Sequence, residues 1–252
     1  MSSLDGKVVF VTGSARRVGR AIALAFADEG ADLVIHHASP SSAEAAGTAV
    51  AEAKERGVDA LVTTGDQGDP DHVSRMLMEV QGYYGRVDVL VNSAALFERG
   101  TFLDIDHEGW QRVMDVNLTG PFMLTQGAAK LMIEAGTHGV IINIGDNGGL
   151  NGWVSYPHHS VSKAGLVMLT RVAALALAEH GIRVNCVVPG PVLLPPGSTE
   201  AAKERLAAAL PLGRLGSPSN VARACVFLAH NDFATGSILR VDGGEGAAGA
   251  GG

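Results

Sequence analysis

The stretch that decides the fold reads Val8-Val9-Phe10-Val11-Thr12-Gly13-Ser14-Ala15-Arg16-Arg17-Val18-Gly19. An apolar run rich in β-branched residues passes through small residues into a segment with helical periodicity. Small residues at 13–15 let backbone N–H groups approach a pyrophosphate, and the positive end of the following helix attracts the same anion. The stretch therefore predicts a strand, a phosphate-binding turn and a helix.

The rest of the chain repeats the alternation of strand and helix. Apolar, strand-like segments lie at 8–12, 32–36, 60–64, 87–91, 140–144, 183–188 and 238–241, and helix-period segments lie at 18–29, 41–56, 70–83, 107–135, 157–180 and 218–229. Strands that are apolar throughout belong in a sheet covered on both faces. A TIM barrel needs eight such units. We expect a single domain, 1–252, with a doubly wound (Rossmann) three-layer α/β fold and a seven-stranded parallel sheet.

Composition narrows the class of protein. The 252 residues are 46% hydrophobic and 18% charged, with a net charge of −7, which excludes a mainly disordered chain. We find no basic block, which argues against nucleic-acid binding. The start does not resemble a signal peptide and no apolar run reaches membrane-spanning length, so we expect no membrane association and a cytoplasmic location. Cys186 and Cys225 have apolar neighbours and are predicted to be reduced core residues. The Gly/Ala-rich segment 243–252 is predicted to be a flexible tail.

The choice of dinucleotide is made at the end of the second predicted strand. NAD enzymes place an acidic residue there on the ribose 2′-hydroxyl. This chain reads Ile35-His36-His37-Ala38-Ser39, without a carboxylate, and carries Arg16 and Arg17 in the phosphate turn. Guanidinium and hydroxyl donors attract a 2′-phosphate. NADP(H) is therefore predicted over NAD(H), and the two histidines are expected to be ordinary strand-end residues rather than metal ligands.

These motifs resemble those of the short-chain dehydrogenase/reductase family along nearly the whole chain. The resemblance rests on Thr12–Gly19, Asp66-Gln67, Asn92-Ser93-Ala94-Ala95, Asn117, Val188-Pro189-Gly190-Pro191-Val192 and Leu239-Arg240-Val241-Asp242-Gly243-Gly244. It implies a homotetramer that pairs the helices near 107–135 and 157–180. The implied cofactor-binding residues are Gly13, Ser14, Arg16, Arg17, Val18, Gly19, His37, Ala38, Ser39, Asp66, Gln67, Asn92, Ser93, Ala94, Lys163, Pro189, Gly190 and Val192.

Three positions are similar to the pteridine reductase branch of the family. Arg17 replaces the middle glycine of the usual turn, Phe97 falls where that branch stacks a flat heterocycle against the nicotinamide, and Asp146 occupies the place of the usual catalytic serine. Each residue also has an ordinary structural interpretation: Arg17 as a surface charge, Phe97 as a core residue and Asp146 as a helix cap. Their coincidence favours the pteridine reductase branch.

The catalytic motif departs from the family pattern. The family carries Tyr-x-x-x-Lys on one helix face, whereas this chain reads His159-Ser160-Val161-Ser162-Lys163, and its nearest tyrosine, Tyr156, is out of register. The Lys163 ammonium favours a neutral His159 ring, and Asp146 favours a protonated one. We expect Asp146 and His159 to act as a coupled proton relay. The predicted catalytic residues are Asp146, His159, Lys163 and Asn117.

The substrate is expected to be a small molecule bound between segments 150–156 and 192–209. Pro and Gly near 193–198 suggest a hinged lid before an alanine-rich helix at about 199–209. The predicted substrate-binding residues are Phe97, Asp146, Trp153, Tyr156, His159 and Leu193, although Trp153 is equally consistent with an oligomer contact. We expect NADPH-dependent reduction of a flat nitrogen heterocycle such as a dihydropterin. The alternatives are a carbonyl reductase or alcohol dehydrogenase using His159, and an NADP(H)-binding sensor without turnover.

Overall fold

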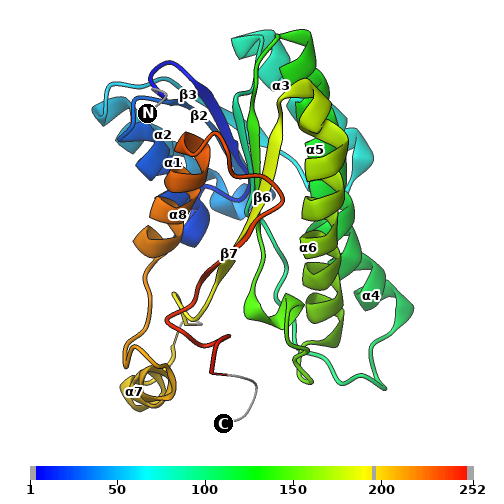
Figure 1. The fold of residues 1–252 in the computed structure, drawn as a ribbon, viewed down its shortest axis with the longest axis vertical. Helices are drawn as coiled ribbons and strands as arrows, with labels where there is room; N and C mark the ends of the chain where they lie inside the picture. Colours follow the sequence, from blue (N-terminus) through cyan, green and yellow to red (C-terminus); the bar gives the residue numbers. More distant parts are fainter. Residues whose placement is uncertain (1–3, 195–196, 249–252) are drawn as a thin grey trace.

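The computed structural model describes residues 4–194 and 197–248. Seven strands form one parallel sheet in the order β3-β2-β1-β4-β5-β6-β7, which confirms the predicted Rossmann fold (Figure 1). The strands are β1 Val8–Val11, β2 Asp32–His37, β3 Ala60–Thr64, β4 Val89–Asn92, β5 Val140–Ile144, β6 Arg183–Pro189 and β7 Ile238–Val241.

Two layers of helices cover the sheet (Figure 1). Helices α1 Arg17–Ala27, α2 Ala43–Glu55 and α8 Pro218–His230 pack on one face, and α3 Pro70–Tyr84, α5 Gly120–Glu134 and α6 Pro157–Leu177 pack on the other. Along β1, Val9 and Val11 contact the first layer, while Val8 and Phe10 contact the second. Because both faces of the strand are buried, every position is apolar. Three short 3-10 helices lie in the connections: η1 Pro40–Ser42, η3 Asn147–Gly149 and η4 Ala178–His180.

The helix predicted over 107–135 is interrupted. Helix α4 runs over His107–Met114, a π-helical segment follows at Asp115–Thr119, and α5 then begins at Gly120. Pro121 has no N–H to donate to the carbonyl of Asn117 one turn earlier, so the regular helical bond cannot form there. Single π turns inside helices are frequent at functional sites. The interruption places Asn117 at full burial beside the start of α6.

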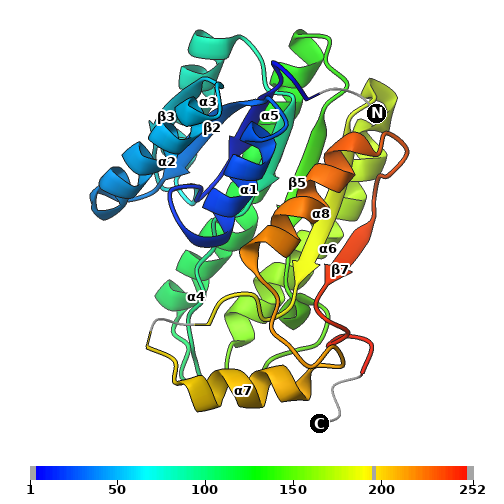
Figure 2. The same cartoon turned by 90° about the vertical axis from the view of Figure 1, so that its left-hand side faces the viewer.

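Helix α7, Glu200–Ala209, lies apart from the layers (Figure 2). It is capped by Thr199, whose Oγ1 accepts from Ala202 N at 3.2 Å. Of the predicted lid, residues 195–196 lie outside the described residues. Residues 243–248 of the predicted tail form hydrogen-bonded turns, in which Asp242 accepts from Gly244 N and Gly246 N at 3.0 and 2.8 Å. The remaining tail positions, 249–252, lie outside the described residues.

One apolar helix is long enough to be tested as a membrane span. The continuous helical stretch Pro157–His180 reaches a mean hydropathy of 1.6, and 39% of that window is buried. The sequence has no uninterrupted apolar run of this length, because Lys163 and Arg171 divide the helix. Val167, Ala173 and Ala174 of this helix belong to the clusters packed on the sheet, which is typical of a core helix in a soluble domain.

Candidate active site

The predicted site residues gather at the carboxyl ends of the strands. Strands β1 and β4 are neighbours, and the chain continues from β1 toward one edge of the sheet and from β4 toward the other. Ligands of open α/β sheets bind in the crevice outside such a switch point. Gly13 follows β1, Asn92 ends β4, Asp146 follows β5 and Pro189 ends β6. The sequence motifs therefore converge at one end of the sheet.

The phosphate turn is fixed by contacts between two loops. Thr12 Oγ1 accepts from the backbone N–H groups of Ser93 and Ala94 at 3.0 and 2.9 Å. Gly13 has a φ of +67°, and a Cβ there would lie 3.1 Å from the Cα of Ala94. A Cβ on Gly19 would lie only 2.4 Å from the carbonyl oxygen of Gly13. Both glycines are thus required by the close approach of backbone to backbone.

The turn has the properties of an anion site. Helix α1 begins at Arg17 with no side-chain cap and no acidic residue in its first turn, so its N-terminal N–H groups remain available. Arg17 is exposed and adopts φ +55°, a left-handed conformation that a side chain rarely takes. Arg16 donates from Nη2 to the carbonyl of Ser41 at 2.6 Å. These groups fit the phosphates of a dinucleotide.

Polar side chains surround the end of β2, beside this turn. His37 Nδ1 donates to the Ser39 carbonyl at 2.9 Å, and Nε2 then accepts from Thr64 Oγ1 at 2.9 Å. Ser39 Oγ bonds Ser41 Oγ at 2.8 Å. Hydroxyl groups rather than carboxylates line this position, as a 2′-phosphate requires. His37, Ala38 and Ser39 therefore lie where the sequence placed them.

The loop after β3 carries an amide, Gln67, and a carboxylate, Asp66, with different partners. Gln67 Nε2 donates to the carbonyls of Ala94 and Val116 at 3.0 and 2.6 Å, whereas its Oε1 is buried without a partner. Asp66 Oδ1 accepts from Gly68 N at 2.8 Å. Gln67 thus links β3 to the π segment, which leaves Asp66 as the exposed member of the predicted adenine pair.

A buried polar chain connects β4, β5 and α6. Asn92 Nδ2 donates to Asn143 Oδ1 at 2.8 Å, and Asn143 Nδ2 donates to Thr170 Oγ1 at 2.9 Å. The Oδ1 atom of Asn92 is buried without a partner. Buried polar atoms are nearly always bonded, so an orphan acceptor beside a predicted cofactor cleft marks a place for a ligand donor.

Lys163 reaches the site from α6 with most of its bonding capacity free. Its Nζ donates to the carbonyl of Ile144 at 2.7 Å. An ammonium carries three donors. Burial lowers the pKa of Lys163, although the nearby Asp146 carboxylate opposes that shift. A buried lysine with spare N–H groups fits the ribose hydroxyls of a nicotinamide nucleotide.

Asp146 and His159 form a direct pair next to Lys163. Asp146 Oδ2 bonds His159 Nε2, and Asp146 Oδ1 accepts from Gly149 N at 3.1 Å. Burial raises the pKa of Asp146, but the hydrogen bond from His159 and the charge of Lys163 outweigh it and hold that pKa below its ordinary value. The side chain of His159 is 2% exposed and that of Asp146 is 17% exposed. Asp146 is therefore the member of the pair that a substrate can reach.

The other side of the His159 ring is also occupied. His159 Nδ1 lies 2.9 Å from the Leu96 carbonyl, which can only accept. Asn117 donates from Nδ2 to that same carbonyl at 2.9 Å and to Ser162 Oγ at 3.1 Å, so its 3.3 Å approach to His159 Nδ1 carries no further proton. The structure brings Asn117, Asp146, His159 and Lys163 together, as predicted.

An aromatic group, Phe97, Trp153 and Tyr156, borders the His159 ring. Phe97 stacks on Tyr156 with centroids 4.3 Å apart and meets His159 edge-on at 4.7 Å. Trp153 lies parallel to His159 at 6.4 Å. Arg99 Nε donates to the Tyr156 hydroxyl at 2.9 Å. Phe97 is predicted to face a substrate; one face of its ring meets Tyr156, and the side chain remains half-exposed. Leu193, on the far segment, is 39% exposed.

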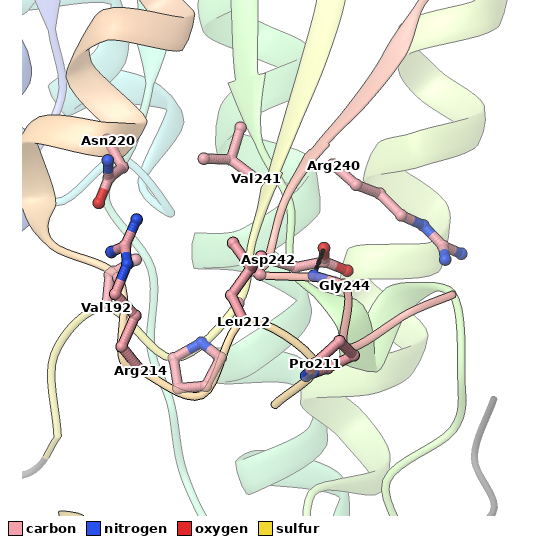
Figure 3. A pocket seen from close by; sticks show the side chains of 13 residues that line it. Val192, Pro211, Leu212, Arg214, Asn220, Arg240, Val241, Asp242 and Gly244 are labelled. Carbon is pink, nitrogen blue, oxygen red and sulfur yellow. Dashed lines mark hydrogen bonds between the residues drawn. The ribbon is translucent and has the colours of Figure 1, made fainter. Parts of the chain in front are cut away.

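The loop after β6 lines a pocket of about 420 Å³ (Figure 3). Gly190 and Val192 line it together with Arg214, Asn220 and the end of β7. In this view Arg214 points toward Asn220, and Arg240 points away from the centre. Gly190 N donates to the Val241 carbonyl at 3.1 Å, so β7 supports the predicted nicotinamide-side loop.

Three groups that bond to residues of the site were not predicted from the sequence. The Leu96 carbonyl, the Arg99 guanidinium and the imidazole of His36 all bond to groups of the site. A backbone carbonyl has no sequence signature, and His36 was set aside as an ordinary strand residue. The arginine two positions after Phe97 was the one available signal.

Comparisons with known proteins agree with this geometry. Residues 13–245 match the family model described as Enoyl-(Acyl carrier protein) reductase. The chain is 36% identical to L-rhamnose 1-dehydrogenase (NAD(P)(+)) of Sphingomonas sp. (strain SKA58), over 97% of this chain and 98% of that protein. It is also 36% identical to 3-oxoacyl-[acyl-carrier-protein] reductase of Synechocystis sp., with the same two coverages, 97% and 98%.

Solved structures are similar over the same extent. A blue fluorescent protein from a metagenomic library, in complex with NADPH, superposes with a TM-score of 0.89 at 34% identity, covering 97% of this chain and 99% of that one. A short-chain type dehydrogenase/reductase from Mycobacterium marinum gives 0.88 at 32% identity, again over 97% and 99%. A Rossmann domain with this site is an NAD(P)-dependent oxidoreductase. The chain belongs to the short-chain dehydrogenase/reductase family.

Proposed function

We propose that this protein is an NADP(H)-dependent reductase of a flat nitrogen heterocycle such as a dihydropterin, with Asp146 as the group that protonates the substrate. The observation that carries the proposal is the Asp146–His159 pair, which stands where the family resemblance implies serine and tyrosine. The absence of a carboxylate at the end of β2, the exposed Arg17 and the relatives that use NAD(P)(+) or bind NADPH support the cofactor.

The number of protons in the pair follows from its partners. His159 Nδ1 faces a carbonyl, so that nitrogen carries a proton. The bond between Nε2 and Asp146 Oδ2 needs one more proton, held by either atom. Imidazolium with carboxylate and neutral imidazole with carboxylic acid are the two forms of one coupled acid. The pair therefore stores a transferable proton at the edge of the cleft.

The proposed reaction balances as hydride plus proton. NADPH supplies the hydride when it is bound, and Lys163 orients its ribose. The carbon of a C=N bond gains the hydride while the nitrogen gains the proton of Asp146, so the product carries C–H and N–H. The proton given up is the one that Asp146 shares with His159 Nε2, so the pair is left as a carboxylate and a neutral imidazole and takes a new proton from solvent. The second ring bond of His159, to Leu96, keeps the imidazole in position throughout.

The aromatic group suits a flat ligand. Phe97 and Trp153 meet edge-on at 6.1 Å, and Phe97 is half-exposed, so a planar ring has an apolar face available beside Asp146. The other face of the Phe97 ring meets Tyr156, which Arg99 fixes from outside. Substrate binding thus requires little ordering of side chains.

A second candidate is interconversion of a carbonyl and an alcohol. The curated relatives named above act on rhamnose and on 3-oxoacyl groups, both of which involve oxygen rather than ring nitrogen. In that reaction the same Asp146–His159 proton would go to a carbonyl oxygen. The residues used are identical, so the substrate decides between the two.

The deciding experiment follows NADPH oxidation with dihydropterins and with a matched panel of ketones and aldoses. Turnover of the pterins alone supports the proposal, turnover of carbonyl compounds alone replaces it with the second candidate, and NADPH binding without any turnover indicates the sensor. Phe97→Leu is the control variant, because a lost stacking face should raise KM for a pterin about tenfold and leave a small aldose unaffected.

We also infer that the domain 1–252 works as a homotetramer in the cytoplasm. Val161, Met168, Val172 and Leu175 are exposed at spacings of seven, four and three along α6, so they share one face of that helix. Exposed apolar stripes mark interaction surfaces. Sedimentation of wild type and Leu175→Glu tests the assembly, and a wild-type monomer would refute it.

A further inference from the structure

His36 is a buried histidine that the mechanism above does not use. It lies on β2 with no exposed surface, between the phosphate turn and the residue after β3. Its Nδ1 accepts from Gly13 N at 3.0 Å, and its Nε2 donates to the Gly65 carbonyl at 2.8 Å. Its backbone N–H donates to Ser14 Oγ at 2.9 Å. One residue thus contacts both Gly13 and Ser14 of the turn.

These partners fix the protonation state of the ring. A backbone N–H can only donate, so Nδ1 must be unprotonated, and a carbonyl can only accept, so Nε2 must carry the proton. Burial lowers the pKa of His36, the Gly65 carbonyl opposes that shift, and the facing charged groups, His37 and Asp66, act in opposite directions. Phe10 contacts the ring edge-on from β1. The folded protein therefore holds His36 neutral, in one tautomer.

We propose that neutral His36 is a positioning residue for NADP(H), because its Nδ1 holds the Gly13 N–H and thereby sets the phosphate turn for the cofactor. Protonation would set an N–H of the ring against the N–H of Gly13 and remove that bond. Gly13 has little freedom to compensate, since its space is bounded by Ala94. Cofactor affinity then depends on His36 remaining neutral.

Binding of NADPH without substrate tests this inference apart from the proposed reaction. Calorimetry from about pH 7.5 to about pH 5.5 would compare wild type with His36→Asn, which keeps an acceptor near Nδ1 and cannot titrate, and with His36→Leu, which removes the acceptor. The 2′-phosphate of the cofactor also titrates, near pH 6, so the difference between variants is the informative quantity. His180→Asn, an exposed histidine on η4, is the matched control.

The expected result near neutral pH is that His36→Leu binds NADPH about tenfold more weakly than wild type, because a buried donor loses its partner. His36→Asn should stay close to wild type and lose less affinity on acidification. Equal affinity of His36→Leu and wild type would overturn the proposal. Should the leucine variant not fold, the wild type decides by NMR: the titration midpoint of His36 must move to lower pH when NADPH binds, and an unmoved midpoint refutes the coupling.

Discussion

The phosphate turn and the proposed proton-transfer centre lie at the same end of the sheet and are built in opposite ways. The turn is mostly backbone: Thr12, Gly13 and Gly19 set how closely two loops approach. The centre consists of ionisable side chains: Lys163 and His159 are buried, and Asp146 beside them is partly exposed. Anion binding by the turn depends on backbone geometry, whereas the proposed proton transfer at the centre depends on how the ionisable side chains set one another's charge.

The two regions also differ in where their charged side chains lie. Arg17 keeps its guanidinium in solvent, where a phosphate can replace water. Lys163 and Asp146 compensate each other inside the protein, and neither is easily removed alone, because the partner would be left buried and unpaired. Substitutions in the turn should therefore change affinity, whereas substitutions in the centre should change rate and pH dependence.

The largest effect is expected at Asp146. Asp146→Asn cannot transfer a proton, so kcat should fall about a thousandfold, while the Kd for NADPH stays close to wild type. Stopped-flow NADPH oxidation and calorimetry measure the two quantities. Asp28→Asn, an exposed aspartate paired with Arg56, is the control and should retain full activity. If Asp146→Asn kept turnover within tenfold of wild type, the proton role of the pair would be wrong.

The next effect is expected where the two regions meet, at Lys163. Lys163→Met keeps the length of the side chain and removes its charge and donors, so the Kd for NADPH should rise about a hundredfold. Fluorescence titration of NADPH measures it. Lys203→Met on exposed α7 is the matched substitution and should bind as wild type does. Unchanged affinity in Lys163→Met would show that this lysine belongs to the centre alone.

A smaller change is expected at Arg17. Arg17→Gly removes a guanidinium from the turn and relieves the φ of +55°, so NADPH affinity should fall about tenfold without a lower melting temperature. Parallel titrations with NADH separate the phosphate contact from the backbone, since NADH binding should change little. An equal loss for both nucleotides would mean that Arg17 does not contact the 2′-phosphate.

The smallest expected effect is on stability in acid. The pKa of Asp146 is below its ordinary value, so its carboxylate stabilises the folded state above about pH 4, and this contribution is lost as the pH falls further. Chemical unfolding should show Asp146→Asn less stable than wild type by about 2 kcal/mol at neutral pH, and the two should converge near pH 3. A difference that does not change with pH would indicate a packing defect.

Much of the fold was predictable because the central strands β1, β4, β5 and β6 are largely apolar and are buried on both faces. The interruption at Asp115–Thr119 was missed, since helical periodicity continues through it and only Pro121 signals the break. The turns after Asp242 were not predicted, because glycine and alanine give no packing signal. The contact at this segment, from Asn147 Nδ2 to Glu245 at 2.6 Å, joins residues far apart in the sequence.

The site was predictable where spacing along one element suffices. His159 and Lys163 are four positions apart on α6 and therefore share one face of that helix, and Asp146 follows a recognisable strand. His36 could not be assigned a role, because its partners, Gly13 and Gly65, belong to two other segments and appear together only in the sheet. Sequence patterns gave the residues of the centre, but not which nitrogen faces which partner.

The bond from Asn147 to Glu245 has a practical consequence for handling the protein. Glu245 belongs to the last described turns of the chain, and Asn147 is the immediate neighbour of Asp146. The described turns at 243–248 thus lie close to the Asp146–His159 pair, whereas Val8 opens its strand at the opposite end of the sheet. Purification handles therefore belong at the amino terminus.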